Sequence, residues 1–146
     1  MATFSQNKYT QQYNQSRILT ASPAELTLML YDGAIKFCNI ALLGFEQSDW
    51  SKVHINIVKV ENIIMEFQAT LNRKYAVADD FDKLYKYIYG LLVDANVYKD
   101  KELLERALVE IRGMRDTWKE VMRLTNNGTN VGNAAGNYDP LGQRQE

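Results

Sequence analysis

The sequence predicts an all-α protein: an antiparallel up-down four-helix bundle with a flexible N-terminal arm and a disordered C-terminal tail. Three observations lead to this fold class. The only prolines, Pro23 and Pro140, bracket a region without internal proline. Four segments of that region repeat apolar residues every three or four positions, the period of a helix with a buried side. No segment alternates as a strand does, and short connections favour antiparallel neighbours.

The first predicted helix runs from about residue 23 to 45. Ser22 is the N-cap, Pro23 occupies the first helical position, and Glu25 completes a capping box. From Leu26 to Tyr31 almost every residue is apolar, so apolar side chains point all round the helix. We assign one stripe to the core and a second to the surface. The core stripe is Leu26, Leu30, Gly33, Phe37, Ile40 and Gly44, and the surface stripe is Leu28, Tyr31, Ile35 and Leu42.

The second predicted helix follows the break at QSDW, where Ser48 or Asp49 is the cap, and ends near Asn72. Its core seam is Val53, Ile57, Val60, Ile64, Phe67 and Leu71. Beside the seam lies a second apolar row of Ile55, Val58, Asn62, Met65 and Ala69. A thick core that absorbs the second rows of both helices is the alternative interpretation.

The third helix is predicted to be capped by Asp79 or Asp80, with Phe81, Leu84, Ile88, Leu91 and Ala95 inward. Tyr85, Tyr87 and Tyr89 cannot all face the core. Asp100 is the predicted cap of the fourth helix. Its inward residues are Leu104, Ala107, Leu108, Ile111, Met114, Trp118 and Val121.

Gly33, Gly90 and Gly113 fall inside predicted helices, where each glycine costs about 1 kcal/mol relative to alanine. Two explanations stay open. Neighbouring helices approach closely at these points, or the backbone of a partner lies against them.

The chain divides into three predicted regions. Residues 1–21 form a flexible arm without acidic residues, residues 22–124 form the bundle, and residues 125–146 form the tail. The tail holds half of the chain's eight glycines and few large apolar groups. It cannot bury enough surface to offset its ordering entropy, which predicts disorder.

Composition excludes several function classes. A net charge of -1 gives no electrostatic reason for binding nucleic acid, and no segment is apolar enough for membrane insertion. A single cysteine, Cys38, and the lack of a signal peptide predict a cytoplasmic protein. His54 is the only histidine, so no metal or cofactor site is expected. Without nucleophile or phosphate-loop motifs, we expect no enzymatic activity.

Four motifs resemble those of the FliS family, the flagellin-specific export chaperones of bacterial flagella. They are SPAELTLMLYDGAIKF at 22–37, TLNR at 70–73, LYKYIYGLLVDAN at 84–96 and RDTWK at 115–119. The resemblance implies a four-helix bundle that holds the disordered C-terminal segment of flagellin in the cytoplasm. It implies that this prevents premature polymerisation and delivers flagellin to a component of the flagellar export gate.

The resemblance and the excess apolar surface together give a set of binding residues. The partner-binding residues are expected to be Leu28, Tyr31, Ile35, Ile55, Val58, Asn62, Met65 and Tyr85. In FliS-like proteins the N-terminal segment can lie over part of the flagellin-binding groove when flagellin is absent. We therefore expect the arm to act as a lid through Tyr9, Tyr13, Ile18 and Leu19. A homodimer stays open, and the alternative function is a self-associating helical adaptor without a flagellin client.

Overall fold

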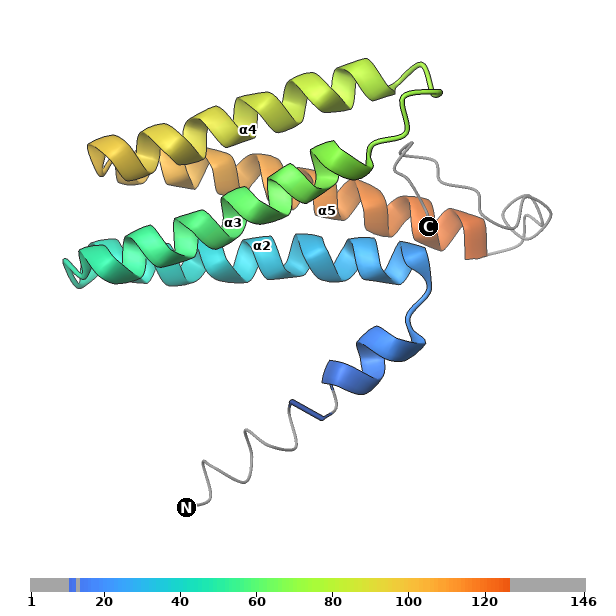
Figure 1. Ribbon diagram of the computed structural model, residues 1–146, viewed down its shortest axis with the longest axis horizontal. Helices are drawn as coiled ribbons and strands as arrows, with labels where there is room; N and C mark the ends of the chain where they lie inside the picture. Colours follow the sequence, from blue (N-terminus) through green and yellow to red (C-terminus); the bar gives the residue numbers. More distant parts are fainter. Residues whose placement is uncertain (1–10, 13, 127–146) are drawn as a thin grey trace.

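The structure is a computed structural model, and it describes residues 11–12 and 14–126 (Figure 1). Four long helices and a shorter helical segment at 14–20 make up almost all of this part, which contains no β-strand. The prediction of an all-α protein is therefore confirmed. The predicted tail and most of the predicted arm, including Tyr9 and Tyr13, lie outside the described residues.

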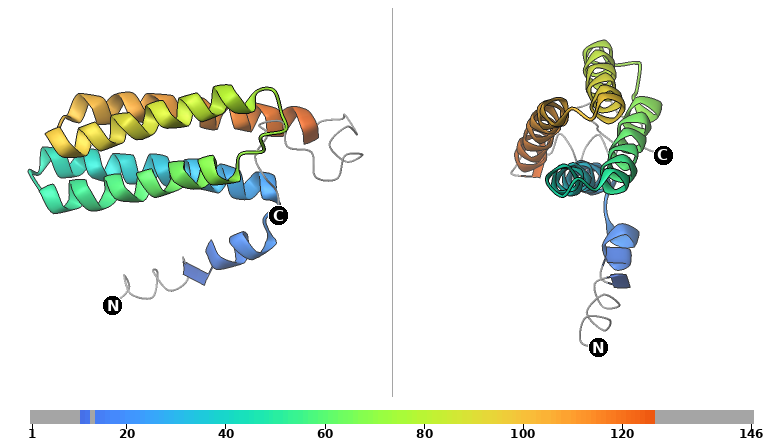
Figure 2. Two further views of the ribbon diagram at one scale, coloured as in Figure 1. Left: turned by 45° about the horizontal axis from the view of Figure 1, so that its top comes forward. Right: turned by 90° about the vertical axis from the view of Figure 1, so that its left-hand side faces the viewer.

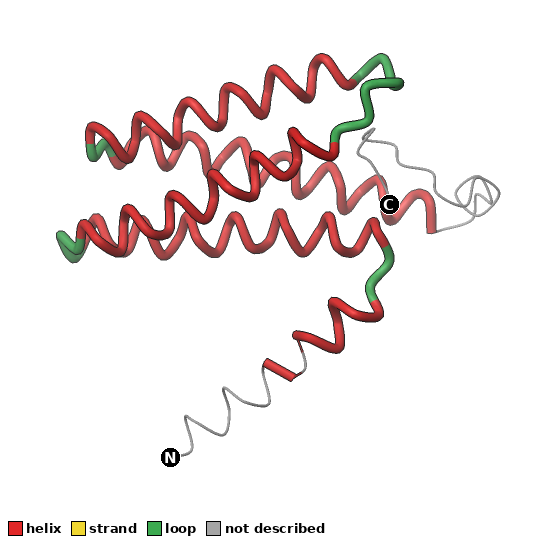
Figure 3. The backbone as a smooth tube through the Cα atoms, in the orientation of Figure 1, coloured by secondary structure: helices red, strands yellow, loops and turns green. Residues whose placement is uncertain are grey.

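The long helices are α2 (Pro23–Glu46), α3 (Trp50–Thr70), α4 (Ala78–Tyr98) and α5 (Lys101–Asn126). Each packs against two others, in the cyclic order α2, α3, α4, α5 and back to α2. The end-on view of Figure 2 shows this ring. Figure 3 shows the connecting loops at alternate ends of the molecule, so successive helices run in opposite directions.

Three helices begin at the side chains that the sequence indicated. Ser22 Oγ accepts a hydrogen bond from the Glu25 N–H at 3.2 Å, directly before Pro23. At the start of α3, Asp49 Oδ1 accepts from the Lys52 N–H at 3.0 Å. Asp100 Oδ1 accepts from the N–H groups of residues 102 and 103 at the start of α5. These bonds satisfy N–H groups that have no partner within their own helix.

The predicted cap of α4 is wrong. This helix begins at Ala78 and its N-cap is Val77, which makes no side-chain cap bond. Asp79 and Asp80 lie inside the first turn instead. Carboxylates in that turn are favourable without capping because they face the positive end of the helix dipole. Ala78 is almost completely buried, so packing of the first residue fixes the start of α4 two or three residues earlier than an aspartate cap would.

The core lies along the axis of the four helices and takes side chains from all of them. Trp118 of α5 is 2% exposed, and its indole Nε1–H donates to the Ala24 carbonyl of α2 at 2.9 Å. This bond satisfies the polar atom of a large buried side chain. It also ties the second half of α5 to the first turn of α2.

The expectation that no segment is apolar enough for a membrane is corrected by α2, the one described helix that is long and apolar enough to cross a membrane by length and composition. Helices at the centre of a protein core pass the same test. α2 packs against both α3 and α5, and its innermost residues are fully buried.

Candidate binding surface

The outer side of α3 carries a row of exposed and half-exposed apolar side chains. Val53, Ile57 and Val60 of the same helix are fully buried, and this seam fixes which side of α3 faces outward. On the opposite side, Ile55 is 49% exposed and Met65 is 43% exposed. We call the set Ile55, Val58, Asn62, Met65 and Ala69 the α3 outer row; Val58 is half-buried, and Asn62 and Ala69 are exposed.

The predicted surface stripe of the first helix is wrong at two positions. Tyr31 is 0% exposed and Ile35 is 8% exposed, and both belong to the core. Leu28 of the same stripe is partly buried and packs against the core. Tyr85 of α4, also a predicted binding residue, is 0% exposed.

A cluster of aromatic rings explains this burial. The Tyr31 ring lies 4.6 Å from the Phe67 ring, and Phe67 stacks on Tyr85 with centroids 5.7 Å apart. Phe81 adds a fourth ring, 6.3 Å from Tyr85. Aromatic rings bury large areas and gain further from such geometry. The cluster brings together α2, α3 and α4, so these two tyrosines hold the core together and are not available to a partner.

The stripe of α2 that we assigned to the core lies beside α3. A Cβ atom on Gly33 would sit 3.7 Å from Ile63 Cδ1, and one on Gly44 would sit 3.0 Å from Val53 Cγ2. The Lys59 ammonium lies over the Phe37 ring, 5.0 Å from its centroid. The assignment of this stripe to the core is therefore wrong for most of its members: only Gly44 is buried, and Leu26 is 37% exposed. The others, Leu30, Gly33, Phe37 and Ile40, are half-buried.

The arm borders a hollow with apolar and charged walls that the sequence pattern did not indicate. Residues 14–20 are helical and exposed, with Ile18 51% exposed and Leu19 85% exposed. Ile18 and Arg17 form one wall of a hollow of about 450 Å³, and α2 forms the other through Met29, Gly33 and Phe37 among others. Figure 2 shows this arm helix on the outer side of α2 and α3, away from α4 and α5. Of the predicted lid residues, Ile18 thus lies at an apolar surface of α2.

Burial makes Cys38 a poor nucleophile. Its side chain is 0% exposed, and loss of solvation raises the pKa of the thiol to about 12 despite the nearby Arg112 charge. Only the thiolate attacks or binds a metal, so Cys38 acts as a small core residue. The described residues contain no group of three or more histidine, cysteine, aspartate or glutamate side chains that could hold a metal ion. His54 Nδ1 instead pairs with Asn96 Nδ2 of α4 at 2.9 Å.

These features define a small helical protein with an apolar outer face, the kind of surface through which proteins bind other proteins. The sequence profile described as flagellar protein FliS matches residues 5–125, most of the chain. The chain therefore belongs to the FliS family.

Several relatives carry the name flagellar secretion chaperone FliS. The chain is 38% identical over 118 residues to the one from Bacillus subtilis strain 168, covering 81% of this chain and 88% of the relative. It is 29% identical to the one from Salmonella typhimurium strain LT2, over 77% of this chain and 86% of the relative. The Escherichia coli K12 protein is 28% identical, with 77% and 88% covered. The family is thus one of chaperones that serve flagellum assembly and protein secretion.

Proposed function

We propose that this protein is a cytoplasmic, non-enzymatic export chaperone that binds the disordered C-terminal segment of flagellin. Binding hides the apolar residues of that segment, prevents premature polymerisation, and presents flagellin to a component of the flagellar export gate. The antiparallel up-down bundle serves as a rigid support for the bound segment. Family membership supports the chaperone role, and the apolar surface supports the mode of binding.

The α3 outer row is the single observation that carries this proposal. Ile55, Val58 and Met65 recur along one side of a helix and stay accessible although the same helix has a full core seam. Apolar anchors at such spacing suit an amphipathic helical segment laid along the bundle. A segment that folds on binding loses several kcal/mol to ordering, so the complex is specific and still able to release its client.

The test is a titration of the full chain with a peptide of the flagellin C-terminal segment. Ile55→Asp and Met65→Asp each place a charge in the α3 outer row, and we expect each to weaken binding by about tenfold or more, since buried anchors dominate such interfaces. Val109→Asp is the matched control. Val109 is 64% exposed on α5, away from the α3 outer row, and its variant should bind as the wild type does.

Unchanged binding by both α3 variants would contradict the assignment of the α3 outer row. A chain that forms dimers and ignores the peptide would support the self-associating adaptor instead. Light scattering with and without the peptide separates these results, because a chaperone complex gains the mass of one peptide.

We also propose that the arm is a lid that competes with flagellin for the apolar surface of α2. The wall that Ile18 forms opposite Met29 and Phe37 supports this role. A tethered segment has a local concentration of about millimolar order, so weak contacts suffice to occupy the surface. Occupancy lowers the apparent affinity for the client by the fraction of open chaperone.

Changing Ile18 and Leu19 together to serine should therefore tighten binding of the flagellin peptide severalfold. The same change should increase the binding of a hydrophobic dye to the free protein. Isothermal titration of wild type and variant measures the first effect. Weaker binding with an unchanged melting curve would mean that these residues contact flagellin directly.

A further inference from the structure

Two mid-helix glycines have no packing reason within the described part of the chain. A Cβ on Gly90 or Gly113 would meet no atom of that part within 4 Å, whereas one on Gly44 would meet three within 3.2 Å. Close approach of helices thus explains Gly44 and does not explain Gly113. A glycine at position 113 costs about 1 kcal/mol of helix stability relative to alanine. A contact with a segment outside the four long helices would explain why glycine stands there.

Gly113 lies in an apolar groove between α4 and α5. The floor is Tyr31 and Met114, both buried. Phe81 and Leu84 of α4 line it as well, together with Glu110 and Thr117 of α5. The groove encloses about 270 Å³, just under the roughly 300–1,000 Å³ of pockets for drug-sized ligands. Its size and apolar floor suit a few side chains of a peptide segment.

Glu110 adds a carboxylate to the lining of the groove. It lines the groove and forms no ion pair with another described residue, unlike Glu105 or Glu120 of the same helix. The groove therefore favours an apolar segment that carries a basic residue nearby.

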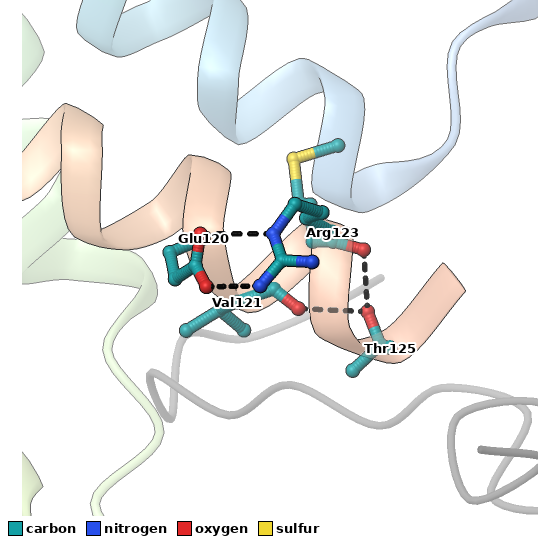
Figure 4. Close-up of polar contacts among 5 residues, drawn as sticks. Glu120, Val121, Arg123 and Thr125 are labelled. Atoms are coloured by element: carbon teal, nitrogen blue, oxygen red, sulfur yellow. Dashed lines mark hydrogen bonds and ion pairs between the residues drawn. The ribbon is translucent and has the colours of Figure 1, made fainter. Parts of the chain in front are cut away.

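The chain itself continues toward such a segment. α5 ends at Asn126, about 20 Å along its axis from Gly113 at 1.5 Å per residue. Figure 4 shows how the last turn is closed. Arg123 pairs with Glu120, and Thr125 Oγ1 donates to the Val121 and Met122 carbonyls. The continuation of the chain thus starts at a defined point, half the length of α5 away from the groove at its middle.

Residues 127–146, for which no placement is described, contain apolar residues three positions apart and then a base. These are Tyr138, Leu141 and Arg144. The stretch between Asn126 and Tyr138 reaches up to about 40 Å when extended, about twice the distance to Gly113. A segment that turned back along α5 would pass Thr117 first, then Gly113, then Glu110. In that direction Tyr138 and Leu141 precede Arg144, so the apolar side chains meet the groove and the base follows toward Glu110.

We propose that the segment 127–146 docks in the groove between α4 and α5 of its own chain, with Tyr138 and Leu141 over Gly113 and Arg144 near Glu110. This docking departs from the prediction of a disordered tail, because the groove, and not a core within the segment, supplies the surface against which its apolar residues are buried. Two apolar anchors alone are weak, but tethering gives them a local concentration of about millimolar order. The site lies apart from the α3 outer row, so it does not depend on the proposed client contacts.

Disulfide trapping in the full chain tests this site. The variant pair Gly113→Cys with Asn137→Cys leaves both anchors in place, and the buried Cys38 does not compete. The matched control is Gly90→Cys with Asn137→Cys, because Gly90 is equally open and lies on α4. In a glutathione redox buffer, we expect the Gly113 pair to close at least about tenfold faster. The product should be an intramolecular disulfide whose rate is independent of protein concentration.

The charge contact has its own variants. Glu110→Arg should slow closure severalfold, and adding Arg144→Glu to it should restore the rate. Equal rates for the Gly113 and Gly90 pairs would overturn the docking site. Disulfide-linked dimers whose formation rises with concentration would assign the groove to a second copy and overturn the intramolecular contact. If the charge variants close at the same rate as the parent pair, the contact between Glu110 and Arg144 is overturned.

Discussion

α2 and α3 lie side by side, but they use their apolar side chains differently. In α3, a buried seam and the exposed outer row occupy opposite sides of the helix. In α2, one apolar stripe enters the core through Tyr31 and Ile35, and the other packs beside α3 through Gly33 and Phe37. α2 therefore buries one stripe in the core and leaves the other half-buried at the surface beside the arm, whereas the α3 outer row is open along the helix. Substitutions should separate these roles.

Among the substitutions that only shorten a side chain, the largest effect is expected at Tyr31. Tyr31→Ala removes a fully buried ring that contacts Phe67, and large aromatic deletions in cores cost about 3–5 kcal/mol. Denaturant unfolding measures the loss, with Tyr87→Ala as the control because Tyr87 is 47% exposed. A loss below about 1 kcal/mol at Tyr31 would show that α2 does not depend on this side for its packing.

The next effect concerns the contact between the two helices. Gly44→Ala would bring a Cβ within 3.0 Å of Val53 Cγ2 and 3.2 Å of the Asp49 carbonyl oxygen, and such overpacking costs about 1–3 kcal/mol. Gly33→Ala meets only Ile63 Cδ1 at an ordinary 3.7 Å. It should leave stability unchanged or raise it by up to about 1 kcal/mol through helix propensity. Thermal melts of the two variants give the signs, and a stabilising Gly44→Ala would disprove the tight contact.

A small effect on stability is expected at the α3 outer row. Ile55→Asp and Met65→Asp change exposed side chains, and such changes usually fall within about 0.5 kcal/mol. Ile35→Asp on α2 is the contrast, since it buries a carboxylate in the core and should prevent folding. Circular dichroism melts compare the three. If the two α3 variants unfold, the α3 outer row belongs to the core, as Tyr31 and Ile35 of α2 do.

The smallest effect is expected where α3 leads into α4. Asp82 pairs with Lys86 at 2.9 Å and with Arg73 of the connection at 3.2 Å. These hydrogen bonds lower the pKa of the Asp82 carboxyl below its ordinary 3.8. Since the folded pKa is depressed, the stabilisation is present above the unfolded value and is lost as the pH falls through the folded value.

Melting temperatures of wild type and Asp82→Asn should therefore differ slightly near neutral pH and converge below about pH 3.8. Because both pairs are at the surface, high salt should also reduce the difference. A difference that persists in acid would assign the effect of Asp82 to packing and not to its charge.

The sequence by itself determined the helical class and most helix ends. Proline placement and the period of apolar residues indicate helices regardless of what packs on them. Caps such as Ser22, Asp49 and Asp100 act through bonds to N–H groups two or three residues away, so local sequence suffices to predict them. The start of α4 was not predictable in this way because burial of Ala78, and not a capping bond, fixes it.

The outer row of α3 was predicted because one seam of this helix is clearly richer in large apolar residues than the other side. In α2 both stripes are apolar, and a periodic pattern gives the angle between stripes without saying which neighbour each one meets. Only the tertiary structure decided this. The aromatic cluster of Tyr31, Phe67 and Tyr85 joins three helices across long sequence separations, and that shared contact turns Tyr31 inward. The groove at Gly113 has the same origin, because it exists only where α4 and α5 lie beside each other.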